Sequence, residues 1–227
     1  MAIKENLKLR VVHDKLEAGA SITLRPEMRV VYCRTGTVRI IEGGRRRILS
    51  EDNAQLVQAE TIIEAAVGPA TVWRWELVPV DSDDAATLSH GAGVDSQNKG
   101  AYALPLPDDE RQFAIRCDQV SFPPGGEALT HIHAAPGVRC LHTGEIFIDS
   151  LGKQWTATPG VTWLERGPEH VYAKTWDQGP ANFIRVMVIP SAYSGKSTIS
   201  YVKPEDAQKP KSQQYYRYLE EEIQLPG

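Results

Sequence analysis

The chain has 227 residues, 41% hydrophobic content and a net charge of −4, which is ordinary for a globular protein of one large domain or two small ones. This charge gives no reason to expect nucleic acid or an anionic membrane as a partner. No window approaches the ~20 apolar residues of a membrane span, and residues 1–8 lack the apolar run of a signal peptide. We therefore expect a cytoplasmic protein.

Three cysteines are spread widely and irregularly along the chain, which fits neither a disulfide framework nor a zinc finger. We expect reduced, buried packing residues at Cys33, Cys117 and Cys140.

Eighteen glycines and fifteen prolines indicate many short elements with turns between them, which favours strands over helices. Residues 30–40 form the pattern of a strand, a Thr-Gly turn and a second strand, and residues 138–148 repeat it 108 positions later. Each segment predicts a hairpin. Residues 68–79 and 179–190 both begin Gly-Pro-Ala and lie 111 positions apart. Two tandem copies of one β unit explain both pairs.

In chain order we predict a first copy at residues 1–80, a linker at 81–112, a second copy at 113–190 and a tail at 191–227. The linker prediction rests on abundant Asp, Ser, Ala and Gly with little hydrophobic periodicity. Within the tail, residues 212–224 predict a short helix, because Tyr215, Tyr218 and Leu219 share one face at helical spacing.

The second copy contains His131-Ile132-His133 after a Pro-Pro-Gly-Gly turn, and His170 follows about forty residues later in Gly-Pro-Glu-His. Side chains alternate along a strand, so His131 and His133 share a face with their α-carbons about 6.6 to 7 Å apart. Two imidazoles at this spacing can bind one ion at about 2.0 to 2.2 Å, and a histidine from a neighbouring strand can complete the site. The pattern predicts a metal site with open positions for a substrate.

These motifs resemble those of the cupin superfamily, small antiparallel jelly-roll barrels whose two-copy members are called bicupins. The first cupin motif is Gly, five residues, His-x-His, three or four residues, Glu, six residues, Gly. Here it begins at Gly125 and ends at Gly144, and the second motif runs from Gly160 to His170. The resemblance implies an all-β protein of two tandem barrels, with a short C-terminal helix or tail.

The sequence departs from the family at Gly137, where the first motif has its glutamate ligand. A site of three neutral imidazoles would keep the full charge of a divalent ion, which favours an anionic or enolisable substrate. The first copy has residues such as Thr23, Arg25 and Thr61 around the equivalent positions, so a barrel forms without histidines there. A degenerate, metal-free second barrel is the alternative.

Several residues near the motifs are candidates for chemistry. Arg139 lies two residues after Gly137 on the same strand face, so we expect its guanidinium to bind a substrate carboxylate. The alternative is an ion pair with an acidic residue at the surface. Glu165 and Glu169 are candidate catalytic bases or solvated turn residues. Trp163 and Tyr172 are candidate substrate contacts or barrel wall.

We thus expect His131, His133 and His170 to bind one divalent ion, with iron, manganese, nickel, copper and zinc left open. The resemblance favours a metal-dependent dioxygenase or lyase acting on a small oxygenated or carboxylated metabolite. A non-enzymatic binder or sensor of a small molecule, with a structural metal or none, is the alternative. We also expect a homodimer, since jelly-roll sheets of this family often pair.

Overall fold

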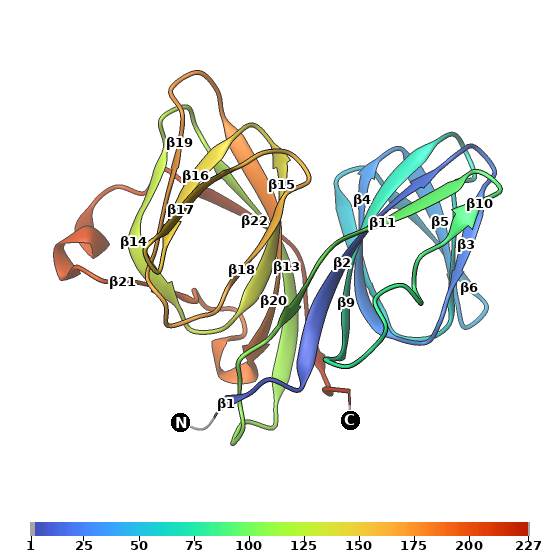
Figure 1. Cartoon of the computed structure of the whole chain (residues 1–227), viewed down its shortest axis with the longest axis horizontal. Helices are drawn as coiled ribbons and strands as arrows, with labels where there is room; N and C mark the ends of the chain where they lie inside the picture. Colours follow the sequence, from blue (N-terminus) through green and yellow to red (C-terminus); the bar gives the residue numbers. More distant parts are fainter. Residues whose placement is uncertain (1–2, 227) are drawn as a thin grey trace. The chain divides into compact units, whose positions relative to one another are not determined.

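The computed structural model describes residues 3–226 and divides the chain into two compact units, residues 5–103 and residues 104–225 with Ile3–Lys4. In Figure 1 each unit is a β-barrel built from two sheets. Paired strands run antiparallel throughout the described chain, as predicted for jelly-roll barrels. No helix in the described residues is long and apolar enough to cross a membrane. The three cysteines are free and buried, which confirms that prediction.

The first unit has a six-stranded sheet in the order β10-β11-β2-β9-β4-β7 and a four-stranded sheet in the order β3-β8-β5-β6. The strands of the larger sheet are β2 (Leu7–Leu16), β4 (Met28–Thr35), β7 (Asn53–Val57), β9 (Ala70–Pro79), β10 (His90–Gly91) and β11 (Val94–Ala103). Those of the smaller sheet are β3 (Ser21–Leu24), β5 (Thr37–Glu42), β6 (Arg45–Ser50) and β8 (Thr61–Glu64).

The second unit has two five-stranded sheets, in the orders β18-β15-β20-β13-β22 and β17-β16-β19-β14-β21. The first consists of β13 (Phe113–Phe122), β15 (Gly137–Thr143), β18 (Thr162–Glu165), β20 (Ala181–Pro190) and β22 (Gln214–Ile223). The second consists of β14 (Glu127–His133), β16 (Ile146–Ser150), β17 (Lys153–Ala157), β19 (Val171–Thr175) and β21 (Ile199–Tyr201). Outside these sheets, β1 (Ile3–Lys4) pairs with β12 (Leu106–Pro107), and two short 3₁₀ turns cover Ser191–Tyr193 and Pro204–Gln208.

The repeated Thr-Gly turns do not form the predicted hairpins. Each carries the chain from one sheet to the other, because β4 and β5 pair with different partners, as do β15 and β16. Gly36 and Gly144 adopt positive φ angles of 81° and 76° at these corners. A Cβ on either glycine would collide with the carbonyl oxygen of the Gly-Pro-Ala segment, Pro69 in one copy and Pro180 in the other. The two repeated segments therefore contact each other in the same way in both units.

The predicted linker at residues 81–112 is wrong over residues 94–103, which form β11 and pair with β2 along its length. β11 has few apolar residues because much of it is exposed near the sheet edge. The predicted C-terminal helix is also wrong. Residues 214–223 form β22, paired with β13, so tertiary pairing has overridden the local helical spacing of three side chains.

Candidate metal centre

His131 and His133 project from β14 into the second barrel, as the strand alternation predicted. Both side chains are 4% exposed, and their ring centroids lie 4.9 Å apart. His131 and His133 are buried on either side of the partly exposed Ile132, as alternation along a strand requires. The pairing of β14 with β19 shifts register between Ala128 and His131, so Ala128 is buried as well although it lies three residues before His131.

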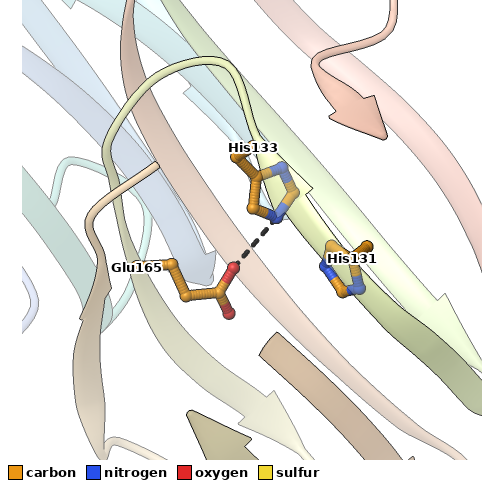
Figure 2. A group of neighbouring side chains, drawn as sticks. All are labelled: His131, His133 and Glu165. Atoms are coloured by element: carbon orange, nitrogen blue, oxygen red, sulfur yellow. Dashed lines mark ion pairs between the residues drawn. The ribbon is translucent and has the colours of Figure 1, made fainter. Parts of the chain in front are cut away.

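The third side chain that converges on them is Glu165, at the end of β18 (Figure 2). Its Oε2 atom lies 3.0 Å from Nε2 of His133. One ligand atom from each of His131, His133 and Glu165 lies within 4.8 Å of the other two. Within residues 3–226 this is the one group of three such side chains with metal-binding geometry. The first unit contributes none.

Glu165 compensates for the glycine at the usual glutamate position. Gly137 on β15 is the direct cross-strand partner of Glu165 on β18. A Cβ on Gly137 would lie 2.6 Å from Cγ of Met187, so this backbone position has no room for a side chain. The carboxylate therefore reaches the site from the neighbouring strand. The expectation of three neutral imidazoles is wrong for this reason.

His170 does not join the cluster, which corrects the predicted ligand set. It is exposed in the segment between β18 and β19, and its backbone carbonyl accepts a hydrogen bond from Ser150 at 3.1 Å. The side chain lines a separate surface pocket beside Glu169 and Tyr172. The spacing of the second motif predicted that His170 would reach the histidine pair. After Gly167, which has a φ of 121°, and the exposed Pro168, the chain instead runs along the outer surface.

Two other candidates lie outside the cavity. Glu169 forms an ion pair with Arg166 at 3.2 Å and is partly exposed. Tyr172 donates a hydrogen bond to Oε2 of Glu127 at 2.9 Å, and burial together with that carboxylate raises the pKa of Tyr172 to about 12. Neither residue contacts the histidines, so the catalytic prediction for Glu169 and the substrate-binding prediction for Tyr172 gain no support from the geometry.

Trp163 and Arg139 do lie at the site, and both contact Glu165. The Trp163 indole donates a hydrogen bond to Oε1 of Glu165 at 3.0 Å. Arg139 is fully buried, with Nη2 2.5 Å from Oε2 of Glu165 and Nη1 donating to the carbonyl of Gly137. Its Nε has no hydrogen-bond partner. Both carboxylate oxygens of Glu165 are thereby engaged.

The electrostatics of the cluster follow from burial and from the Arg139 charge. Burial would raise the pKa of Glu165, but Arg139 and the hydrogen bond from His133 more than offset this and hold that pKa well below its usual range. Burial lowers the pKa of His133 to about 3, although the hydrogen bond to Glu165 opposes the shift. The pKa of His131 is lowered by burial as well. Both imidazoles are therefore neutral at pH 7, the form that binds metal ions.

Local contacts also orient His131. Its Nδ1 atom lies 2.8 Å from the carbonyl oxygen of Leu129, a contact that assigns the proton to Nδ1 and leaves the Nε2 lone pair free. Metal-binding histidines use this kind of outer hydrogen bond to fix their tautomer. Nδ1 of His133 has no such partner.

The space between these side chains is small. The cavity measures about 20 Å³, enough for about one water molecule. Besides the cluster and Arg139, its wall includes aromatic and aliphatic side chains and the charged Arg185: Val120, Phe122, Ala128, Ile146, Ile148, Trp163, Ala173, Phe183, Arg185 and Tyr215. An ion fits this space, and a substrate of more than a few atoms needs the wall to open.

The residues present fit a divalent ion in donor type and spacing. Two neutral imidazoles and one carboxylate converge, and the tautomer of His131 leaves a lone pair available. Arg139 opposes binding, because its guanidinium already neutralises the carboxylate that an ion would share. The site thus combines suitable ligands with an unfavourable neighbouring charge.

Searches with the sequence find no matching family model and no matching curated protein. Solved structures do match. A point variant of oxalate decarboxylase from Bacillus subtilis superposes with a TM-score of 0.63 at 14% identity, covering 91% of this chain and 74% of that one. A deletion mutant of the same enzyme gives 0.62 at 13% identity with the same coverage. A third structure, from a study of its Mn(II) centres, gives 0.61 at 13% identity, again with the same coverage.

The chain has a bicupin fold. This confirms the predicted jelly-roll architecture, and the two-sheet barrel of each unit is the cupin barrel. The signal that the sequence patterns did not reveal was the pairing of strands. Glu165 and Trp163 share a strand face, and that face becomes the interior when β18 pairs with β15 opposite Gly137.

Proposed function

We propose that the second barrel binds one divalent metal ion through His131, His133 and Glu165. The observation that carries this proposal is the convergence of the three buried donors within 4.8 Å. Two imidazoles and one carboxylate with open positions form the ligand set of non-haem Fe(II) oxygenases. The structural similarity to an enzyme described with Mn(II) centres supports manganese as well. Iron and manganese are therefore the favoured ions among the five considered.

The protein is proposed to be a metal-dependent enzyme, a dioxygenase or lyase acting on a small oxygenated or carboxylated metabolite. When bound, the ion would act as a Lewis acid on an oxygen atom in its open positions. Arg139 lines the cavity, and its unpartnered Nε remains as a donor for a substrate carboxylate. Trp163 holds Glu165 in place through the other carboxylate oxygen. The similarity to oxalate decarboxylase supports a short carboxylate as substrate.

A second candidate function is non-enzymatic binding of a small ligand, with no catalytic metal. The specific observation in its favour is the cavity of about 20 Å³, closed by aromatic side chains such as Trp163 and Phe183. The Arg139–Glu165 ion pair also satisfies the carboxylate without an ion.

Metal analysis tests the proposal directly. The parent protein, purified without chelators and reconstituted with iron or manganese, is expected to hold about one ion per chain. His131→Ala and Glu165→Gln should lose it, because each removes a donor. His170→Ala is the matched control and should retain the metal, since His170 is exposed and outside the cluster.

The results separate the candidates. Loss of metal in the His170→Ala variant but not in Glu165→Gln would contradict the proposed ligand set. A folded parent protein that takes up no ion would contradict the metal proposal and favour the non-enzymatic ligand-binding function. Metal-dependent consumption of oxygen or release of carbon dioxide, screened first with oxalate and other short carboxylates, would support the enzyme. The proposed homodimer is tested separately by sedimentation equilibrium.

A further inference from the structure

A second concave site lies beside the metal cavity, where residues of β13, β20 and β22 meet the segment at residues 195–199. This groove measures about 340 Å³. Its lining consists of charged and polar residues with one aromatic ring: Arg116, Asp118, Arg185, Gly195, Lys196, Ser197, Thr198, Ile199, Tyr215 and Arg217. All belong to the second unit. We refer to this set as the basic groove.

The basic groove carries excess positive charge. Four cationic side chains line it, while Asp118 is its one carboxylate. Glu220 lies next to it, accepts a hydrogen bond from Arg116 at 2.5 Å and forms an ion pair with Arg217 at 3.2 Å. Even with Glu220 included, the cations outnumber the carboxylates by four to two. A concave surface with this balance attracts small anions.

Buried guanidinium groups form the floor of the groove. The side chains of Arg116 and Arg185 are 2% and 6% exposed. Asp118 accepts from Nε and Nη2 of Arg185 at 2.9 and 2.7 Å, which leaves Nη1 outside this bidentate pair. Arg116 is fixed by Glu220 and by the carbonyl oxygens of Tyr193 and Lys196. These contacts hold the two cations in place, as a preorganised anion site requires.

The groove adjoins the metal cavity through shared residues. Arg185 and Tyr215 line both spaces, and the Arg185 guanidinium lies 5.8 Å from the centre of the Tyr215 ring. On the adjacent sheet, Ile199 of the groove is the cross-strand partner of His133. Tyr215 is half exposed and lies on the edge strand β22, so its ring has fewer constraints than the fully buried wall residues.

We propose that the basic groove binds a small oxyanion, a carboxylate or a phosphate, at Arg185, Arg217 and Lys196. Arg217 and Lys196 supply the unburied charges, and Arg185 supplies the fixed donor at the floor. Arg185 and Tyr215 then separate the bound anion from the histidine cluster. Anion binding at this groove does not depend on the proposed metal. A further role of the groove, holding a carboxylate substrate next to the metal cavity, rests on the proposed function.

The test is a titration of the chelator-treated protein with acetate, malonate and inorganic phosphate at constant ionic strength. Calorimetry or NMR chemical shifts measure the binding. Arg217→Ala is expected to weaken binding about tenfold, because it removes one charge-assisted contact. Lys196→Ala should act in the same direction. Both side chains are at the surface of the groove, so the fold is retained. Lys153→Ala removes an exposed charge from β17, outside the groove, and should leave binding unchanged.

Equal affinity in the parent and the Arg217→Ala and Lys196→Ala variants would overturn the groove site. So would binding that requires added metal and disappears in His131→Ala, because the anion would then occupy the metal cavity. Binding without metal that is weakened in the groove variants supports the site even if the metal proposal fails. A preference for malonate over phosphate would identify a carboxylate metabolite, and the reverse a phosphate ester.

Discussion

At the residue scale, the carboxylate of Glu165 has two competing partners, the guanidinium of Arg139 and the proposed metal ion. Oε2 of Glu165 lies 3.0 Å from Nε2 of His133 and 2.5 Å from Nη2 of Arg139. Without an ion, the guanidinium stabilises the buried carboxylate. With an ion, the two positive charges share one carboxylate in a poorly solvated space, and their repulsion weakens ion binding. Arg139 is thus expected to set the metal affinity of this centre.

This competition predicts the effect of Arg139→Met, a replacement of similar length without charge. The metal-free protein should lose about 3–5 kcal/mol of stability, because the partner of a buried carboxylate is removed. Its affinity for a divalent ion should rise by at least about tenfold, since the competing charge is gone. Urea unfolding and competition against a chelator measure the two effects. An unchanged or lower metal affinity in a folded Arg139→Met protein would contradict the competition.

At the element scale, the pairing of β15 with β18 decides where the carboxylate comes from. Gly137 and Glu165 face each other across this pair. Close packing of Met187 against Gly137 excludes a side chain on β15, and the opposite residue on β18 provides the acid. The carboxylate of the proposed metal site therefore comes from β18, and it lies in the barrel interior opposite Gly137.

The same packing predicts that Gly137→Ala destabilises the protein. Its Cβ would lie 2.6 Å from Cγ of Met187 and 3.1 Å from the carbonyl oxygen of Val186. Overpacking of this kind costs about 1–3 kcal/mol, measurable by urea unfolding. Gly179→Ala is the matched control, because a Cβ there meets no atom within 4 Å. Equal stability of the two variants would show that the barrel wall yields at Gly137.

At the scale of the whole molecule, the two units use the same strand framework for different interiors. β9 of the first unit corresponds to β20 of the second through the Gly-Pro-Ala repeat. In the first unit, Glu76 on β9 lies directly between Arg10 and Arg29 on the flanking strands. It is fully buried, and it accepts from Nε of Arg10 and from Nε of Arg29, both at 2.9 Å. At the equivalent place the second unit has Met187 opposite Gly137.

The first unit's ion cluster predicts a dependence of stability on pH. Burial would raise the pKa of Glu76, but Arg74, Arg29 and Arg10 more than offset this, so that its pKa in the folded state lies below the ordinary 4.5. A carboxyl with a lowered folded-state pKa stabilises the protein fully above its unfolded-state pKa. This contribution is lost as the pH falls through the folded-state pKa.

We therefore expect stability to fall below about pH 4.5, and Glu76→Gln to weaken that dependence. At pH 7 the variant should lose about 3–5 kcal/mol, because three buried guanidinium groups lose a partner. Thermal unfolding between pH 7 and 3 measures both effects. Glu60→Gln, at an exposed site, is the control and should match the parent. A Glu76→Gln protein with the parent's pH profile would show that other carboxyls control it.

The amino-acid sequence by itself determined the β class, the two tandem copies and the placement of His131 and His133. These features depend on short-range rules, the two-residue alternation of strands and the recurrence of turn residues. The Thr-Gly and Gly-Pro-Ala segments were sufficient to identify the repeat, because in both units the glycine of the Thr-Gly turn packs against the proline carbonyl of the Gly-Pro-Ala segment.

Only the tertiary structure decided which third side chain joins the two histidines, where each unit ends and that the tail forms a strand. Glu165 and Gly137 are distant in sequence and meet only through the β15–β18 register. β11 and β22 have weak strand patterns of their own and form because β2 and β13 offer unpaired edges. In each case the deciding contact is a backbone or cross-strand interaction between distant segments, which local periodicity does not encode.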